Sequence, residues 1–285
     1  MNGIIIVDKP KDWTSQDVVT KIKRVLKTKK VGHAGTLDPL ATGVLVVLVN
    51  GATKLSDYLM ADNKEYDCNI VIGKATTTED VMGEVVSSKS VTEDLINVDE
   101  VLTSLKGKLS QVPPMYSSLH HNGAKLYELA RMGITVERDA REIEIFDIKR
   151  TSEVIYFDGL ASFDFRAKVS KGTYIRTLCC EIGARLNYPA YMNELRRISS
   201  GNLHINDACT IDDIINDNYK LISMLDALEN INKIEVDEDL FKKINNGMKV
   251  KLDCSDEEVL LTKNNELIAI YEKEDQVYRA KRVWN

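Results

Sequence analysis

The chain of 285 residues has little of what would mark a secreted, metal-bound or membrane protein. It has five cysteines without a C-x-x-C pair, and its four histidines lie outside zinc-ligand spacing of any cysteine. No window approaches the roughly 18 apolar residues of a membrane span, and the apolar run after Met1 is too short for a signal peptide. These absences disfavour a disulfide framework, a structural metal and a membrane partner, and they predict a cytoplasmic location.

The charge of the chain argues at first against a nucleic-acid partner. Its net charge is −6, whereas phosphate binding depends on Lys and Arg. Residues 9–30, however, contain only two acids, against eight basic residues: Lys9, Lys11, Lys21, Lys23, Arg24, Lys27, Lys29 and Lys30. This local excess of 8 − 2 = +6 favours a basic working face that binds phosphates, although the lysines could equally be the solvated side of a helix.

The pattern of apolar residues predicts alternating strands and helices. Strands are expected at 4–7, at the run GVLVVLVN, and at 65–72 and 161–169, where apolar residues alternate. Thr14 and Asp17 fit a capping pattern at the start of a helix over 14–27. Further helices are expected near 98–106, 125–132, 174–186 and 211–228.

This order of elements predicts an α+β fold in which helices flank a mixed, largely antiparallel sheet. The composition shifts near residue 230, where short strands and the turn signals NNG and KNNE begin. We therefore expect two domains, a main domain at 1–230 and a small β-barrel-like module at 231–285.

One acidic residue, Asp38, lies inside the glycine-rich stretch VGHAGTLDPLATGVLVVLVN. Gly32, Gly35 and Gly43 allow tight turns, and Pro39 restricts Asp38 to extended geometry, so its carboxylate is held in a fixed pose. A phosphate-binding P-loop is excluded because no G-K-[ST] follows the glycines. A purely structural aspartate that accepts backbone N–H groups before a proline remains an alternative.

The segment GHAGTLDPLATG resembles the signature loop of the bacterial tRNA pseudouridine(55) synthases, the TruB family. Five other segments resemble the family's blocks in the same order: DKPKDWTS, KEYDCNIVIG, QVPPMYSSLHHNGAKLYELAR, SKGTYIRTL and NELRRISSG. The resemblance covers about residues 3–215, and the tail resembles the family's PUA-type RNA-binding module more weakly. It implies the pseudouridine synthase fold.

The resemblance also implies the reaction, which isomerises a uridine in the T-loop of tRNA, at position 55, to pseudouridine without a cofactor or a metal. Asp38 matches the family's aspartate, and a carboxylate is a nucleophile that is already ionised at neutral pH. Whether it attacks the base or the sugar carbon stays open.

Five accessory residues follow from the same resemblance. Arg176 matches the arginine that pairs with the nucleophile, although it could instead be a phosphate-binding or surface arginine. Tyr66 matches the aromatic residue beside the target base, and Tyr174 and Leu195 match the uracil pocket. Core positions are the alternative for Tyr66 and Leu195. His33 matches the side chain that fills the space left by the flipped base, with a simple turn residue as its alternative.

The expected partner is the T-arm of tRNA, bound by a monomer that needs no obligate protein partner. Lys9 and the lysines of 21–30 would contact phosphates. A loop at about 120–140 resembles the family's RNA-clamping insertion and carries Lys125, Arg131, Arg138 and Arg141. Two alternatives are the catalytic subunit of a guide-RNA-directed ribonucleoprotein and a non-catalytic RNA-binding or RNA-folding module.

Overall fold

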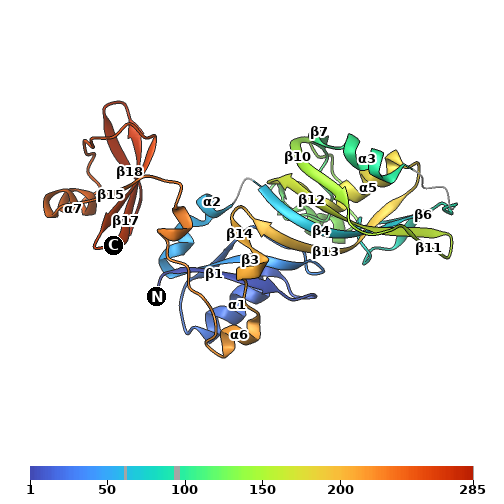
Figure 1. The fold of residues 1–285 in the computed structure, drawn as a ribbon, viewed down its shortest axis with the longest axis horizontal. Coiled ribbons are helices and arrows are strands. Elements are labelled where there is room, and N and C mark those ends of the chain that lie inside the picture. The colour runs from blue at the N-terminus through green and yellow to red at the C-terminus, as the bar shows by residue number, and fades with distance from the viewer. Residues whose placement is uncertain (61–62, 93–96, 285) are drawn as a thin grey trace.

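A ten-stranded sheet forms the centre of the computed structural model, which describes residues 1–60, 63–92 and 97–284. Its main path runs β1-β3-β13-β4-β12-β10-β7, and β2, β11 and β14 pair with its members (Figure 1). All these pairs are antiparallel except β13 with β3. The strands are β1 (Gly3–Lys9), β2 (Val31–Ala34), β3 (Thr42–Val49), β4 (Asn63–Ile72), β7 (Gly107–Gln111), β10 (Arg141–Arg150), β11 (Ile155–Phe157), β12 (Leu160–Ser170), β13 (Ala190–Ser200) and β14 (Leu203–His204). This is the predicted mixed, largely antiparallel sheet.

Three helices cover one face of this sheet: α1 (Ser15–Val25), α3 (Val98–Ser104) and α5 (Ile175–Arg185). Their apolar residues share one buried cluster with alternate residues of the strands, such as Cys68, Phe163 and Phe165. The alternation expected at 65–72 and 161–169 therefore faces the helices. Thr14 caps α1 and exchanges hydrogen bonds with Asp17, as the capping pattern predicts.

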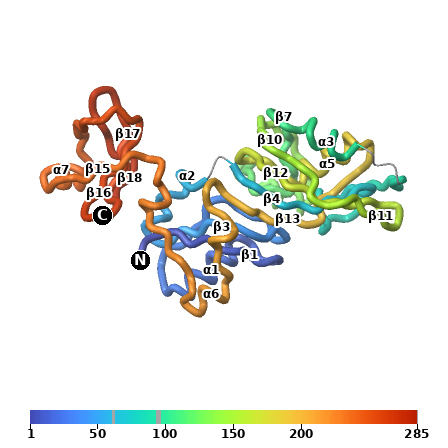
Figure 2. The backbone as a smooth tube through the Cα atoms, viewed as in Figure 1, coloured from blue at the N-terminus to red at the C-terminus, as the bar shows by residue number. Residues whose placement is uncertain are grey.

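The opposite face of β1 and β3 packs against a second cluster. There the 3₁₀ segment η1 (Asn50–Leu55) and α2 (Ser56–Leu59) meet Leu225 and Leu228. Leu260, Leu267 and Ile270 of the C-terminal sheet belong to the same cluster. Because these residues share one core, the C-terminal sheet is packed onto the main domain, as Figure 2 shows beside α2.

The C-terminal segment forms its own four-stranded sheet in the order β15 (Lys233–Glu235), β16 (Glu258–Lys263), β17 (Glu266–Glu274) and β18 (Val277–Val283). It has a separate apolar core around Val259 and Tyr271. The expectation of strands throughout this segment is wrong at one place, because α7 (Glu238–Asn245) lies between β15 and β16. Asp237 caps α7 through the backbone N–H of Leu240.

The helix expected over 211–228 is also wrong. Only α6 (Ile211–Ile215) and a 3₁₀ turn, η3 (Asp226–Leu228), form there. Thr210 starts α6 with a capping box, but Asp217 has a φ of 59°, which ends the helix. The polar run Asn216 to Asn218 thus acts as a stop signal that outweighs the apolar spacing.

The remaining elements are short. A hairpin of β5 (Lys74–Thr76) and β6 (Val85–Ser88) follows β4. The short strands β8 (His120–His121) and β9 (Ala124–Lys125) precede α4 (Leu126–Arg131). The 3₁₀ turn η2 (Ile205–Asp207) follows β14. All five cysteines are free thiols. Among the described residues, no helix has the length and apolar character needed to cross a membrane.

Phe165 tests this account of the core. Its side chain is fully buried, whereas that of Phe157 is 42% exposed. We expect Phe165→Ala to lower the free energy of unfolding by about 3–5 kcal/mol, because it leaves a cavity between the sheet and the helices. The control Phe157→Ala should change it by less than about 1 kcal/mol. Denaturant unfolding measures both values, and equal losses in the two variants would contradict the assignment.

Candidate active site

Asp38 lies in the loop between β2 and β3, and the backbone on both sides of it is held in place. Gly35 and Gly43 have φ values of 92° and 95°, which favour glycine. The backbone N–H of Ala41 donates to the carbonyl of Asp38 (3.1 Å). The hydroxyl of Ser15 accepts from the N–H of Leu37 (2.9 Å) and donates to its carbonyl (3.1 Å), so the start of α1 is tied to this loop.

Arg176, in the first turn of α5, forms an ion pair with Asp38. Its Nε lies 3.0 Å from Asp38 Oδ2. Its Nη1 donates to the carbonyl of Thr78 (3.0 Å) and its Nη2 to that of Tyr116 (2.7 Å). The Arg176 side chain is 4% exposed and that of Asp38 is 39% exposed. A buried, fully engaged guanidinium therefore aims a carboxylate that solvent can still reach.

Asp80 is a second carboxylate near Arg176, and the sequence reasoning missed it. Its Oδ2 lies 3.9 Å from Arg176 Nη1. Its Oδ1 accepts from the hydroxyl of Thr78 (2.5 Å) and the N–H of Met82 (3.0 Å). Glu79 precedes it with a φ of 62°, an uncommon backbone conformation for glutamate. The polar run TTTED was the only signal in the sequence, and by itself it is typical of any turn.

Burial raises the pKa of the Glu79 carboxyl, although the hydroxyl of Thr177 donates to its Oε2 (2.6 Å). Thr177 follows Arg176 on α5. The β5–β6 hairpin is therefore joined to the start of α5 by two adjacent acids, one beside the Arg176 guanidinium and the other beside Thr177.

The three predicted pocket residues differ in how they relate to this ion pair. Tyr66 of β4 and Leu195 of β13 are 7% and 8% exposed, and they share the buried cluster with Leu37 and Ala41, which flank the Asp38 turn. Tyr174 occupies the N-cap position of α5, next to Ile175 and Arg176, and lies close enough to Asp38 and Arg176 to feel their charges. Burial raises the pKa of its hydroxyl, and the nearby charge of Asp38 raises it further.

His33 lies on β2, opposite Val47 of β3, five residues before Asp38. Burial lowers the pKa of its imidazole, and the positive charge of Arg197 adds to this effect. Its Nδ1 is buried and lacks a hydrogen-bond partner within the part of the chain that the structure describes. His33 is therefore a neutral, partly buried ring beside the Asp38 loop.

Lys9 does not contact phosphates, contrary to the expectation from the sequence. Its side chain is fully buried, and its Nζ donates to the carbonyls of Pro10, Trp13 and Pro39. Burial lowers the pKa of the ammonium group from 10.5 to about 8, although the charge of Asp38 opposes this shift. Lys9 thus fixes the carbonyl of the residue that follows Asp38.

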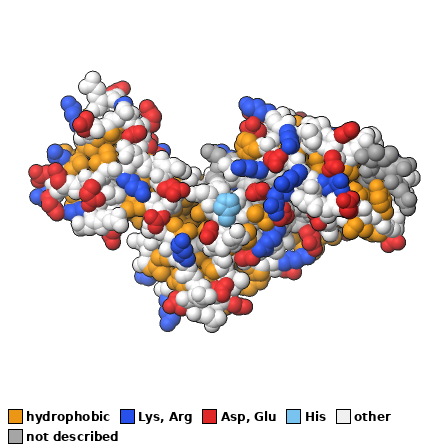
Figure 3. All heavy atoms as spheres, in the orientation of Figure 1, with side chains coloured by type: hydrophobic (Ala, Val, Ile, Leu, Met, Phe, Trp, Pro, Cys, Tyr) orange, Lys and Arg blue, Asp and Glu red, His pale blue; other side chains and the backbone are white. Residues whose placement is uncertain are grey.

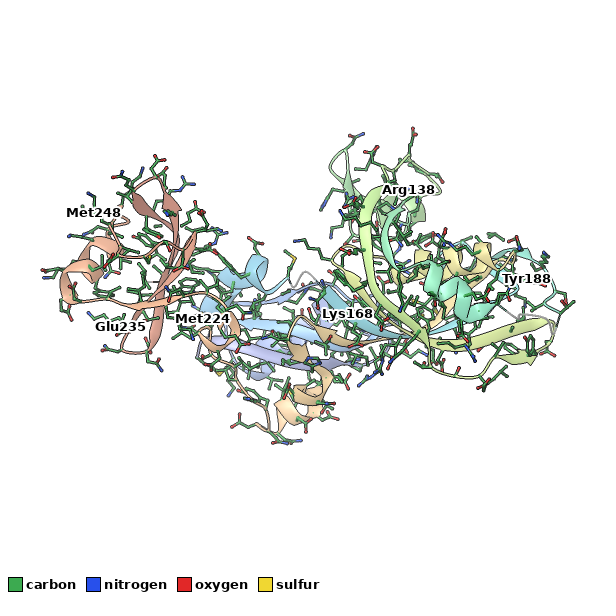
Figure 4. The ribbon with its side chains drawn as sticks, turned by 45° about the horizontal axis from the view of Figure 1, so that its top comes forward. Arg138, Lys168, Tyr188, Met224, Glu235 and Met248 are labelled. Atoms are coloured by element: carbon green, nitrogen blue, oxygen red, sulfur yellow. The ribbon has the colours of Figure 1, made fainter. Side chains whose placement is uncertain are left out.

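A separate open groove of about 480 Å³ crosses the sheet over β4, β12 and β13. Figure 3 shows Lys and Arg side chains gathered over these strands, and Figure 4 shows Lys168 of β12 in the middle of the sheet. Leu195 lines the groove, but Asp38, Tyr66 and Tyr174 do not. The groove and the ion pair are therefore distinct features. Its lining includes Lys11, Leu40, Thr42, Asp67, Asn69, Asp164, Arg166, Asn193, Glu194 and Arg196.

Two family models match the chain. The TruB family pseudouridylate synthase N-terminal domain matches residues 23–175, and the tRNA pseudouridylate synthase B C-terminal domain matches residues 176–231. The first match contains Asp38, Tyr66, Asp80 and Tyr174, and the second begins at Arg176. The C-terminal sheet lies beyond both matches.

Curated relatives extend the similarity to the whole chain. The tRNA pseudouridine synthase B of Streptococcus sanguinis is 39% identical over all of both chains. That of Staphylococcus haemolyticus is 46% identical over 87% of this chain and 85% of the relative. Among solved structures, a chain in a Cbf5-Nop10-Gar1 complex is 25% identical, with a TM-score of 0.69 over 99% of this chain and 84% of that chain.

The buried ammonium of Lys9 predicts a specific dependence of stability on pH. The pKa of Lys9 is about 8 in the folded protein and 10.5 when unperturbed, so the unfolded chain binds the extra proton between these values. The contribution of Lys9 to the free energy of unfolding must therefore rise with pH between about 8 and 10.5, and it levels off below about 8.

Urea unfolding of the wild type and of Lys9→Met at pH 7, 8, 9 and 10 measures this effect. The difference in unfolding free energy, wild type minus variant, should increase from pH 8 to 10. Its slope against pH should approach the value that corresponds to one extra proton bound by the unfolded chain. A difference that stays constant over the series would show that Lys9 has an ordinary pKa.

Proposed function

The chain belongs to the TruB family of pseudouridylate synthases, and on that premise we propose that it converts one uridine in the T-loop of tRNA, at position 55, with Asp38 as the nucleophile. Isomerisation of uridine to pseudouridine in tRNA is the reaction of this family, so the chain is an isomerase. The residues that perform the reaction and the position of the uridine are the proposed part.

The ion pair between Asp38 and Arg176 is the observation that supports this assignment most strongly. A nucleophilic carboxylate must stay charged, keep one oxygen open to the substrate and hold a fixed direction. Arg176 Nε lies 3.0 Å from Oδ2 of Asp38, and the Asp38 side chain is 39% exposed. The carboxylate is therefore accessible to a bound nucleotide, while the guanidinium orients it.

The isomerisation conserves atoms and needs no oxidant. The bond between N1 and C1′ breaks, the detached uracil turns, and C5 joins C1′ while C5 loses a proton and N1 gains one. Asp38 forms a covalent bond to the substrate or stabilises the detached intermediate. We assign Tyr66 to stack on the base and its hydroxyl to relay the proton, and Tyr174 and Leu195 to line the uracil pocket.

The target base must leave the stacked T-loop before the reaction can occur, at a cost of a few kcal/mol. We propose that His33 fills the vacated space and offsets part of this cost, since its ring is neutral and close to the Asp38 loop. RNA shape and extruded bases supply specificity, whereas basic side chains supply affinity.

We further propose that the protein is a cytoplasmic monomer that binds tRNA and acts without a protein partner. Residues 231–285 are proposed as an RNA-binding module appended to the catalytic domain at 1–230. Activity of the purified protein on a bare T-arm transcript distinguishes this from the role of a guide-RNA-dependent subunit, which would require additional components.

Replacing Asp38 tests the catalytic assignment. Asp38→Asn keeps the size of the side chain but removes its charge, so pseudouridine formation should fall by at least 10³-fold while tRNA affinity changes by less than about threefold. Asp158→Asn, at an exposed turn, is the matched control and should keep full activity. Pseudouridine mapping and filter binding give the two values, and an active Asp38→Asn variant would disprove the assignment.

The C-terminal end of α1 and the turn after it supply the proposed phosphate contacts. Lys23, Arg24 and Lys27 are exposed, and the structure shows no carboxylate paired with them in the described chain. Because α1 starts at the Asp38 loop and has 11 residues, these side chains lie roughly 15 Å from that loop.

Charge reversal of these three residues tests the phosphate contacts. The combined change to Glu should raise KM for tRNA by about tenfold or more with little change in kcat, and should reduce the slope of log KM against log salt concentration. Lys220→Glu, an exposed lysine on the α6 side of the fold, is the control. An unchanged KM and salt slope would exclude this surface from the tRNA interface.

A further inference from the structure

Arg197 of β13 is a buried cation that binds backbone on both sides of the Asp38 loop. Its side chain is 1% exposed. Its Nε donates to the carbonyl of Val44 (2.7 Å), its Nη2 to that of Gly35 (3.1 Å) and its Nη1 to that of Thr36 (3.4 Å). One guanidinium therefore joins the beginning of the loop to the strand that follows it.

The partners of Arg197 differ in kind from those of its neighbour Arg196. Arg196 projects to the other side of β13, where it contacts the carboxylate of Asp8 (2.7 and 3.0 Å) and the side-chain hydroxyl of Thr42 (3.4 Å). In the described residues no carboxylate forms an ion pair with Arg197. Burying a charge that only carbonyl dipoles surround costs free energy. If position 197 contributed only to stability, an apolar side chain there would stabilise the fold more than arginine does.

The loop is built closely around the backbone of Arg197. Gly43 lies opposite Arg197 in the parallel pairing of β3 with β13. A Cβ atom at Gly43 would come within 2.2 Å of the Arg197 carbonyl oxygen, and the φ of Gly43 is 95°. This close approach brings the guanidinium within reach of Gly35 and Thr36 across the turn.

The charge of Arg197 also acts on the ionisable groups beside the loop. Burial is the main cause that lowers the pKa of His33, and the positive charge of Arg197 is the second. The same charge also lowers the pKa of Lys9. Lys9 itself binds the carbonyl of Pro39. Two buried cations thus hold four carbonyls of the segment 35–44: Arg197 holds those of Gly35, Thr36 and Val44, and Lys9 holds that of Pro39.

We propose that Arg197 is a positioning residue for the proposed reaction: by holding the carbonyls of Gly35, Thr36 and Val44 it fixes the loop that presents Asp38, without touching the substrate. Arg176 restrains the carboxylate itself, and Arg197 restrains the backbone that carries it. This inference rests on the proposed function of Asp38.

The experiment compares Arg197→Met and Arg197→Lys with the matched controls Arg196→Met and Arg196→Lys. Amide hydrogen exchange, read by mass spectrometry, follows peptides of residues 35–44 and peptides of β4 and β12 as an internal reference. Single-turnover pseudouridine formation and KM for tRNA are measured on the same proteins. Methionine removes all three donors, whereas lysine keeps the charge but cannot span the three carbonyls.

We expect exchange in residues 35–44 of Arg197→Met to accelerate at least tenfold while exchange in β4 and β12 is unchanged. The single-turnover rate should fall at least 50-fold with KM within threefold, and Arg197→Lys should show the same pattern in weaker form. Both Arg196 controls should keep slow exchange in residues 35–44.

Two results would overturn the inference. One is slow exchange in residues 35–44 of the Arg197 variants, and the other is exchange that rises equally throughout the protein. If Arg197→Met does not fold, Arg197→Lys decides by the same readouts. A wild type that forms no pseudouridine would refute the proposed function instead, because the exchange measurement does not depend on activity.

Discussion

The geometry of the site depends on one ion pair. The partly exposed carboxylate of Asp38 is held by the buried guanidinium of Arg176, whose other nitrogens are bound to backbone carbonyls. Arg176 forms an ion pair with Asp38 through Nε, and its two terminal nitrogens donate to the carbonyls of Thr78 and Tyr116. These carbonyls come from two loops, one between β5 and β6 and the other after β7, so displacement of either loop would remove a partner of the guanidinium. The sheet, α5 and the loops matter for function because they converge on this one cation.

The backbone of the Asp38 loop is restrained separately from its side chain. Lys9 binds the carbonyl of Pro39, and Arg197 binds those of Gly35, Thr36 and Val44. Because these cations are buried, moving the carbonyls away would leave the charges without partners, so the loop has few alternative conformations. The cost of burying three cations is consistent with a site where a fixed geometry matters more than maximal stability.

Much of this architecture could be predicted from local patterns. The alternation in β4 and β12 and the capping pair of Thr14 and Asp17 are local rules, and they held. The helix expected over 211–228 failed because a polar stop at Asp217 outweighed the apolar spacing. The roles of Lys9 and Asp80 could not be predicted, since a lysine in a basic stretch and an acid in a polar turn give no sign of burial. Their partners lie up to about a hundred residues away in the chain, and only the fold brings them together.

The most direct test of this account is the single-turnover rate of pseudouridine formation by Arg176→Lys, measured with tRNA at saturating enzyme. Lysine keeps the positive charge but cannot contact Asp38 and the two carbonyls together. The account predicts a rate at least 100-fold below that of the wild type, with a Kd for tRNA within threefold. A rate within a few-fold of the wild type would show that charge alone suffices, and would contradict the claim that the geometry of this ion pair controls the reaction.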